Sequence, residues 1–373
     1  MEYISTAAEL EKLVVVLRKK PVIGIDTESN NLHTYQDKVC LIQLSSETDV
    51  YILDPLAMNN IHALGNVLED PSIVKIIHGC DYDLRSLNRD YGFEIKNIFD
   101  TELAARFTGL NSSNLGNVLD QFLNVKIKKS RSIQTSDWSR RPLSEKALEY
   151  AGSDVLYLSE LHNIMTAKLK DMGRLDWALE EFKLFENIRH VDVDIREEGY
   201  LRLKGVGKLD RRALTILKQL YIIREDEAKM RDVPSFRIVN NDTLVRMSQN
   251  PDFYVEQDLF TENNWINANK QWISETIAKA MELPLLDKPQ KTVRTGRNDE
   301  KARKRLKKLR EWRVAKSAQL GLQPALIFPM QGLEFISSVH PNDISVENSA
   351  YHSSGIRSWQ QNHFLEEVRT VLL

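Results

Sequence analysis

Two carboxylates stand at the end of the first apolar segment after an opening helix. Asp26 and Glu28 follow the run 22–25, and because strand side chains alternate between faces, both would point to the same side. Carboxylate oxygens are the ligands that hard divalent cations such as Mg²⁺ prefer. An isolated pair of this kind is usually a solvated turn. Here the pair ends a segment that should be a buried central strand, which favours a metal site.

A second group of candidates lies farther along the chain. Asp83 comes just after the apolar run 73–77, in the first turn of a predicted helix, where it could also simply complement the helix dipole. Asp81 in the same turn is a rival for either role. Tyr150 and Asp154 are four residues apart, so in a helix they share one face.

Four acids brought together would repel one another unless cations neutralised them. Two divalent ions about 3.5–4 Å apart could do so, and could activate water and stabilise the leaving oxygen during cleavage of a phosphodiester. The hydroxyl of Tyr150, which can donate or accept, could orient that water. The residues therefore predict metal-dependent hydrolysis.

Composition limits the classes of protein to consider. The chain has 373 residues, and 51 Lys and Arg balance 53 Asp and Glu to a net charge of −2, so any affinity for nucleic acid must come from local basic clusters. No apolar run is long enough to span a membrane or to form a signal peptide, and we expect a cytoplasmic protein without a membrane partner. Two cysteines exclude a disulfide framework and a zinc site made by cysteines alone.

The elements that must position these residues can be read from periodicity. Over the first 180 or so residues, apolar runs alternate with amphipathic helices, the first of which opens with a capping box at Thr6–Glu9. Three early runs have connections too short for crossover helices, which predicts an antiparallel meander. The strongest helical pattern begins at Ser144 and continues to about 172. Together these patterns predict a mixed sheet flanked by helices, with strands at 22–26, 39–44, 50–53, 73–77 and 95–99.

Beyond residue 173 the chain is mostly helical and contains an internal repeat. The pattern Leu217-Lys218-x-Leu220-x3-Arg224 recurs 89 residues later as Leu306-Lys307-x-Leu309-x3-Arg313. Apolar residues and prolines that follow also correspond at offsets of 89 or 90. This ordered series predicts two copies of one small helical domain.

The candidate residues resemble a known group of nucleases. Successive motifs are similar to those of the DEDD exonuclease superfamily, and a tyrosine where a sister group has histidine indicates its tyrosine-type branch. The segment 136–144 is similar to bacterial ribonuclease D, and the two repeats resemble HRDC domains, of which the second is more divergent. The motifs are Ile25-Asp26-Thr27-Glu28, His78-x4-Asp83-Leu84, Phe99-Asp100-Thr101 and Tyr150-x3-Asp154.

The resemblance implies a ribonuclease H-like α/β catalytic domain followed by two all-α HRDC-like domains. It implies a 3′-5′ exoribonuclease that releases nucleoside 5′-monophosphates from tRNA precursors and other small structured RNAs. It also implies two divalent ions, Mg²⁺ or Mn²⁺ rather than Zn²⁺, bound by Asp26, Glu28, Asp83 and Asp154, with Tyr150 positioning the water. Ser29 stands where relatives often have a bulky aromatic residue, so stacking on the terminal base would be weaker or supplied elsewhere.

Two basic stretches fit an RNA substrate. The stretch between 125 and 141 precedes the predicted catalytic helix and favours contacts to phosphates; the segment 288–316 is either a second RNA surface or a solvated helix face. Trp138 is a core residue or a stacking platform, and the core is favoured. The residues predicted to contact RNA are Lys126, Lys128, Lys129, Arg131, Arg140 and Arg141.

We therefore predict the following organisation and keep two alternatives. The alternatives are a 3′-5′ DNA exonuclease and a noncatalytic RNA-binding scaffold with an exonuclease fold. Against the scaffold, clustered acids without a use would destabilise the fold. The predicted parts are an exonuclease domain at 1–185, a connector at 186–207, a first HRDC domain at 208–287, a linker at 288–299 and a second, divergent HRDC-like domain at 300–373.

Overall fold

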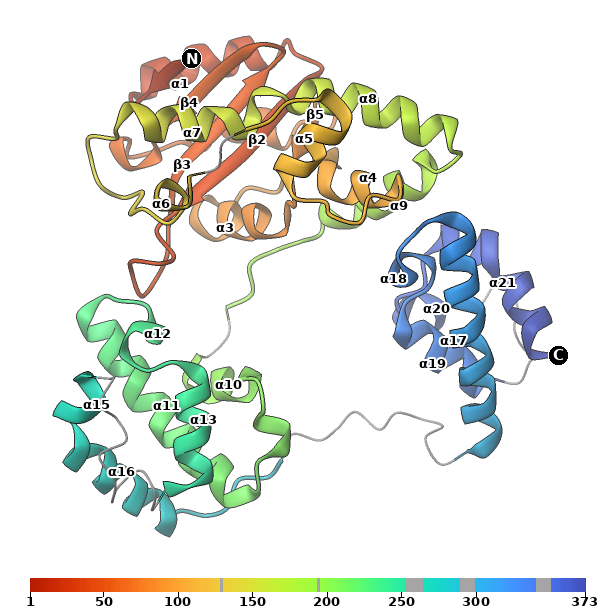
Figure 1. Ribbon diagram of the computed structural model, residues 1–373. Coiled ribbons are helices and arrows are strands. Elements are labelled where there is room, and N and C mark those ends of the chain that lie inside the picture. The colour runs from red at the N-terminus through yellow and green to blue at the C-terminus, as the bar shows by residue number, and fades with distance from the viewer. Residues whose placement is uncertain (128–129, 193–194, 252–263, 289–298, 340–349) are drawn as a thin grey trace. The chain divides into compact units, whose positions relative to one another are not determined.

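The computed structural model of the chain forms two compact units (Figure 1). One unit contains residues 1–28, 39–190 and 293–373, and the other contains residues 29–38 and 191–292. The second helical repeat thus groups with the N-terminal α/β part, residues 1–28 and 39–190, and the first repeat does not. The structure describes residues 1–127, 130–192, 195–251, 264–288, 299–339 and 350–373.

A six-stranded mixed sheet is the centre of the first unit. Its strand order is β1-β4-β3-β2-β5-β6, in which β3 and β4 are antiparallel whereas β1–β4, β2–β5 and β5–β6 are parallel. The predicted mixed sheet is confirmed, and β1 is an edge strand that the sequence did not indicate. The strands are β1 (Glu2–Ile4), β2 (Val22–Ser29), β3 (Val39–Ser46), β4 (Asp49–Leu53), β5 (Val74–Ile77) and β6 (Ile98–Asp100).

Helices cover both faces of this sheet and enclose two apolar cores (Figure 1). One face packs on α1 (Ala7–Leu17), α2 (Gly65–Leu68) and α3 (Asp81–Tyr91). The other face packs on α4 (Thr101–Phe107), α5 (Leu115–Leu123), α7 (Glu145–Leu156), α8 (Leu158–Asp171) and α9 (Leu175–Phe185). Alternation along β2 sends Ile23 and Ile25 to the first core. It leaves Gly24, Asp26 and Glu28 on the α7 side.

The caps of these helices follow the sequence closely. Thr6 and Glu9 form the predicted capping box of α1, and the Ser144 hydroxyl accepts the backbone N–H of Ala147 at the start of α7. Asp100 likewise caps α4 by accepting the N–H of Leu103. These caps depend on neighbours three residues away, so sequence alone could locate them.

The prediction of one continuous helix from Ser144 to about 172 is wrong. The structure divides it into α7 and α8 at Tyr157. At this point the hydroxyl of Ser45 in β3 donates to the carbonyl of Val155, 2.8 Å away. Leu158 meanwhile approaches Gly24 so closely that a Cβ on this glycine would lie 3.1 Å from it. The sheet therefore breaks the helix, whereas the apolar periodicity continues across the break.

The two helical repeats have the same element order. The helices α11 (Arg211–Arg231), α12 (Ser235–Ile238) and α13 (Asn241–Gln249) recur 89 residues later as α17 (Glu300–Leu320), α18 (Pro324–Ile327) and α19 (Met330–Ser338). In the first copy Arg224 donates to the carbonyl of Val239, and in the second Arg313 donates to that of Phe328. The repeat seen in sequence therefore extends to one internal hydrogen bond.

Further elements complete the two repeats and the α/β part. In the first repeat, Tyr200 and Val206, from the predicted connector, join the core of that unit. The remaining helices are α6 (Arg131–Gln134), α10 (Ile195–Glu198), α15 (Asn264–Ala268), α16 (Lys270–Glu282), α20 (Ala350–Ser353) and α21 (Ser358–Leu372). Among the described residues, no helix combines the length and apolar composition needed to cross a bilayer.

The second repeat packs directly on α9 of the N-terminal α/β part. Trp177 of α9 stacks on Trp359 of α21, with ring centroids 4.8 Å apart. The Glu180 carboxylate accepts the backbone N–H groups of Ser358 and Trp359, at 2.6 and 2.9 Å. It thereby caps the start of α21 from the neighbouring part of the chain. The two parts share one apolar core, so removal of the C-terminal repeat would expose Trp177 to water.

Candidate active site

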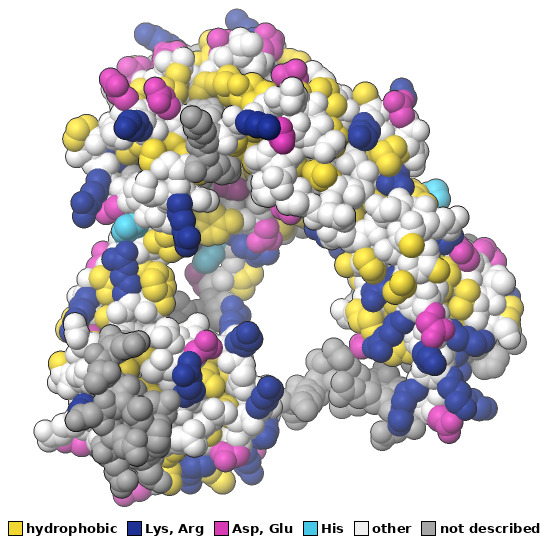
Figure 2. Space-filling model, viewed as in Figure 1, with side chains coloured by type: hydrophobic (Ala, Val, Ile, Leu, Met, Phe, Trp, Pro, Cys, Tyr) yellow, Lys and Arg dark blue, Asp and Glu magenta, His cyan; other side chains and the backbone are white. Residues whose placement is uncertain are grey.

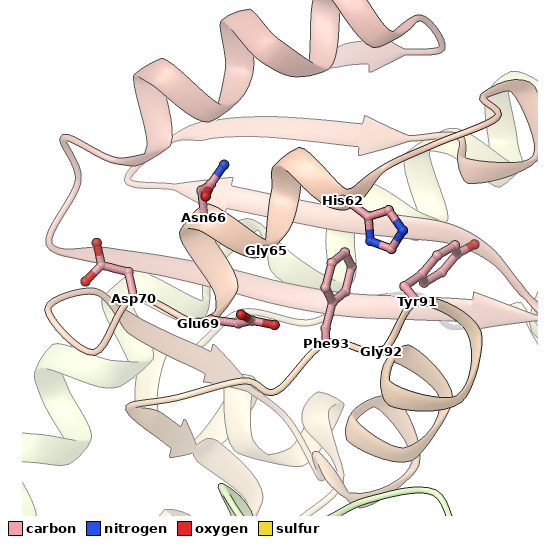
Figure 3. A pocket seen from close by; sticks show the side chains of 8 residues that line it. All are labelled: His62, Gly65, Asn66, Glu69, Asp70, Tyr91, Gly92 and Phe93. Carbon is pink, nitrogen blue, oxygen red and sulfur yellow. The ribbon is translucent and has the colours of Figure 1, made fainter.

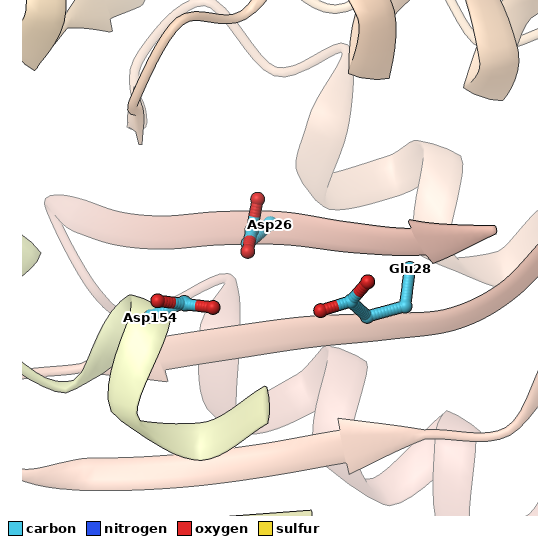
Figure 4. A group of neighbouring side chains, drawn as sticks. All are labelled: Asp26, Glu28 and Asp154. Carbon is cyan, nitrogen blue, oxygen red and sulfur yellow. The ribbon is translucent and has the colours of Figure 1, made fainter. Parts of the chain in front are cut away.

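Strand β2 and helix α7 bring three carboxylates together. Asp26 and Glu28 project from β2, and Asp154 projects from the facing turn of α7 (Figure 4). One carboxylate oxygen from each lies within 4.8 Å of the others. Asp154 is buried, whereas Asp26 and Glu28 are partly exposed. All the donor atoms in this group are carboxylate oxygens, which fits a hard divalent cation.

Asp83 reaches the same end of the sheet by a different route. It lies in the first turn of α3, is buried, and accepts a hydrogen bond from the hydroxyl of Thr27. Thr27 stands between the two β2 acids in sequence and, by strand alternation, on the opposite face. Asp83 is not one of the three closely grouped carboxylates, yet its charge acts on Asp26.

The rival of Asp83 has a different environment. Asp81 is exposed and forms an ion pair with Arg85 one helical turn later, at 2.9 Å. It caps nothing, because the N-cap of α3 is Cys80. The structure thus places Asp83, and not Asp81, beside the strand that carries the acids.

Burial and the closeness of the acids together set the electrostatics of the site. Burial and then the charges of Asp83, Asp154 and Glu28 raise the pKa of Asp26 well above its usual range. Burial raises the pKa of Asp83 to about 6. Burial, with Asp154 next, also raises the pKa of the Tyr150 phenol, which is therefore neutral at pH 7. At Asp26 and Tyr150, a bound cation would offset the part of the shift that comes from neighbouring carboxylates.

Asp26, Glu28 and Asp154 line a hollow of about 210 Å³. Among the described residues, no lysine or arginine lines it, so none of these side chains compensates the negative charge. Sequence reasoning missed three of the lining residues, Leu115, Gln134 and Leu158, which come from α5, α6 and α8. Their signal was weak because none carries a charge and all come from helices predicted only as scaffold.

His78 and Trp138 occupy the environments expected of structural residues. The Nδ1 atom of His78 lies 2.9 Å from the hydroxyl oxygen of Thr101. Trp138 is 1 % exposed, so the prediction that it belongs to the core is confirmed. The centroid of its ring lies 6.1 Å from that of Tyr150, so the two side chains pack against each other.

The predicted RNA-contacting residues divide into three groups. Lys126, Arg131 and Arg140 are exposed, and Arg140 also pairs with Asp137 at 3.3 Å. Lys128 and Lys129 lie outside the described residues. The sixth, Arg141, is exposed and forms an ion pair with Asp54.

Arg141 also forms several hydrogen bonds within the fold. Its guanidinium donates to both carboxylate oxygens of Asp54, at 2.5 and 2.7 Å, and to the carbonyls of Trp138 and Cys40. A bidentate pair of this kind fixes the loop before α7 to the end of β4. This pair could not be predicted from the sequence, because Asp54 lies 87 residues earlier in the chain.

A second hollow lies on the other face of the sheet, between α2 and the end of α3 (Figure 3). It has a volume of about 580 Å³, and its wall includes the carboxylates of Glu69 and Asp70 and the aromatic rings of His62, Tyr91 and Phe93. Its wall contains no lysine or arginine, so it offers no fixed cation to a phosphate.

Comparison with known proteins matches both parts of the chain. Residues 1–170 match the family described as 3′-5′ exonuclease, and residues 213–251 match the HRDC domain. Ribonuclease D of Desulfotalea psychrophila is 29 % identical over 330 residues, 87 % of each protein. Ribonuclease D of Shewanella is 29 % identical over 293 residues, which cover 78 % of this chain and 74 % of the relative.

Solved structures agree with this match at the level of the fold. The crystal structure of Escherichia coli RNase D superposes with a TM-score of 0.71 at 23 % identity, covering 99 % of this chain and 98 % of that one. The similarity therefore extends over both units and both helical repeats.

Proposed function

From a 3′-5′ exonuclease domain and an HRDC domain in one chain homologous to ribonuclease D, we infer that this protein is a 3′-5′ exoribonuclease. It is a hydrolase that removes nucleotides from RNA 3′ ends. The observation that carries this conclusion at the site is the group of Asp26, Glu28 and Asp154, whose oxygen atoms lie within 4.8 Å of one another.

We further propose roles for the individual residues, by resemblance to the tyrosine-type branch. Asp26, Glu28, Asp83 and Asp154 would hold two divalent ions, Mg²⁺ or Mn²⁺. When bound, these ions supply positive charge that stabilises the attacking and leaving oxygens of the phosphodiester. The four acids act by fixing that charge at the end of β2, and their crowding makes the site dependent on it.

Tyr150 would orient the attacking water. Because its phenol is neutral at pH 7, the hydroxyl can both donate and accept a hydrogen bond. The Tyr150 ring packs against Trp138. This packing limits the side-chain rotamers of Tyr150, so the hydroxyl is held in position before the substrate binds.

The RNA assignment is tested by end-labelled substrates. With Mg²⁺, RNA labelled at its 5′ end should shorten progressively, and RNA labelled at its 3′ end should release labelled mononucleotide at once. Matched DNA should react far more slowly. Faster cleavage of the DNA would favour the alternative of a DNA exonuclease, and retention of bound, uncut RNA at saturating metal would favour a noncatalytic scaffold.

We propose that residues 300–373 are a second, divergent HRDC-like domain. The shared offset of 89 residues across three helices and the equivalent bonds of Arg224 and Arg313 support this proposal. The first copy would extend over 208–287, around the matched residues 213–251. Structured RNAs such as tRNA precursors would be the substrates; the E. coli protein is described as an exoribonuclease involved in structured RNA processing.

The exposed side of helix α17 is the proposed RNA-binding surface of the second copy. Lysines and arginines gather along its exposed side (Figure 2), and Lys301, Lys304, Lys307 and Lys308 are all exposed. Arg305, by contrast, donates to the carbonyl of Ser337 at 2.7 Å and holds α19 in place. A test of RNA binding should therefore spare Arg305.

The double variant Lys304→Ala/Lys307→Ala should bind structured RNA more weakly and with a flatter salt dependence. Each lost phosphate contact removes counterion release, which lowers the slope of log K against log salt by about 0.7–0.9. Filter binding at several salt concentrations measures this slope. The matched control is Lys12→Ala/Lys19→Ala, which removes two exposed lysines at the α1 end of the exonuclease domain. Equal slopes for the two variants would mean that α17 is only a solvated face.

A further inference from the structure

One polar side chain in the core of the exonuclease domain has no evident use in the fold. Gln43, in β3, is 0 % exposed, and among the described residues neither its Nε2 nor its Oε1 atom has a hydrogen-bond partner. A buried amide without partners destabilises a folded protein, and an apolar residue of similar size would pack there at no such cost. A buried polar group of this kind calls for a physical explanation.

The face of β3 that carries Gln43 is the face that carries the acids on β2. Gln43 is paired with Ile52 of β4. Ile52 belongs to the core that includes Tyr150 and Ala151 of α7. Cross-strand partners point to the same side of a sheet, so the Gln43 side chain lies under α7. This is the side from which Asp154 faces β2.

Register places Gln43 next to Asp26. A Cβ on Gly24 would lie 2.3 Å from the hydroxyl oxygen of Ser45, so these two residues are neighbours on the same face of adjacent strands. The strands run in opposite directions, because the N–H of Asn30 after β2 donates to the carbonyl of Lys38 before β3. Two residues farther toward this connection on each strand, Asp26 and Gln43 share that face. Cross-strand neighbours on one face have Cβ atoms about 4.5–5.5 Å apart when directly opposite and about 7–8 Å apart when diagonal.

The chemistry of an amide suits this position. An amide N–H donates to a carboxylate and fixes its orientation, yet it carries no charge. A lysine here would neutralise Asp26 and compete with the cation for it, whereas an amide leaves the full negative charge available. Outer hydrogen-bond donors of this kind commonly orient metal-binding carboxylates.

We propose that Gln43 is a positioning residue, whose carboxamide donates a hydrogen bond to Asp26 and holds that carboxylate in place when a divalent cation is bound. This inference rests on the proposed function, since it takes Asp26 as a metal ligand. A bound cation would draw the carboxylates together, and the Gln43 amide would then hold Asp26 by a hydrogen bond from the same face of the sheet.

The test compares Gln43→Met and Gln43→Leu in the full-length protein. Both changes keep the volume of the side chain and remove the donor. Calorimetric titration with Mn²⁺ alone should show binding weakened about 10- to 100-fold. The half-saturating Mg²⁺ concentration in the nuclease assay should rise by a similar factor, with little change in KM for RNA. Unfolding midpoints in EDTA should be equal to or above that of the wild type.

The control is Ser46→Ala. Ser46 is also a buried residue of β3 whose hydroxyl lacks a partner, but it points to the opposite face of the sheet. It should leave Mn²⁺ affinity unchanged. Wild-type Mn²⁺ affinity in both Gln43 variants would overturn the inference, as would failure of both to fold, since the amide would then serve the fold alone. Asp26→Asn, measured alongside, separates this result from the proposed function, because full activity of that variant would overturn the metal site itself.

Discussion

Asp26→Asn and Asp154→Asn should each lower the rate of RNA cleavage by about 10³-fold or more, while the protein remains folded. Each change removes one negative oxygen ligand from the closely grouped acids. A bound metal contributes several kcal/mol of transition-state stabilisation, and each 1.4 kcal/mol lost is a factor of ten in rate. Single-turnover cleavage of 5′-labelled RNA at saturating Mg²⁺ measures the effect.

The Asp26→Asn variant should also gain thermal stability when metal is absent. Burial and the neighbouring carboxylates raise the pKa of Asp26, so its ionised form destabilises the metal-free fold at pH 7. Replacing it by a neutral isostere relieves this repulsion. The expected result is a higher unfolding midpoint in EDTA together with a smaller stabilisation by added Mg²⁺. A mutation that merely damaged the fold would lower the midpoint in both conditions.

Asp81→Asn is the matched control for the acids. Asp81 lies two residues from Asp83 on α3 but is exposed and paired with Arg85. It should retain activity within about twofold, because a surface ion pair contributes little to stability. Near-complete loss with Asp81→Asn, combined with full activity of Asp83→Asn, would show that the wrong aspartate had been assigned.

Tyr150→Phe should lower kcat by about 10²-fold and change KM for RNA much less. The ring would still pack against Trp138, and the four carboxylates would be unchanged. Only the hydroxyl that orients the attacking water is lost, and a misplaced reactant can cost about 10²-fold in rate. Steady-state kinetics on a short RNA, with Mn²⁺ binding measured separately, distinguish this effect from loss of metal.

Tyr91→Phe is the control for Tyr150→Phe. Tyr91 ends α3 on the other face of the sheet, where its hydroxyl lies 3.5 Å from the carbonyl oxygen of Val39. Its removal should leave kcat unchanged. Wild-type kcat in Tyr150→Phe would instead make Tyr150 an ordinary core residue of α7.

Removal of the C-terminal repeat is a poor way to separate binding from catalysis in this protein. The repeat covers Trp177, and Glu181 of α9 is paired with Arg357. Its deletion would expose apolar surface on α9 and leave a partly buried carboxylate unpaired, which would destabilise the exonuclease domain. Substitutions on the exposed side of α17 avoid this difficulty.

Features that depend on near neighbours in the chain could be predicted from the amino-acid sequence. Strand alternation placed Asp26 and Glu28 on one face, and the helical period placed Tyr150 and Asp154 together. The cap at Ser144 and the repeat of 89 residues are likewise relations between fixed sequence positions. Each follows from backbone geometry that is the same in every protein.

Which side chains from distant parts of the chain come into contact depends on the tertiary structure. It paired Arg141 with Asp54, placed the Thr27 hydroxyl on Asp83, and divided the long helix at Tyr157. These outcomes depend on which buried donors and acceptors can reach each other once the sheet has formed. Periodicity carries no information about such partners, because a buried polar group is satisfied by whatever the packed chain brings within hydrogen-bonding distance.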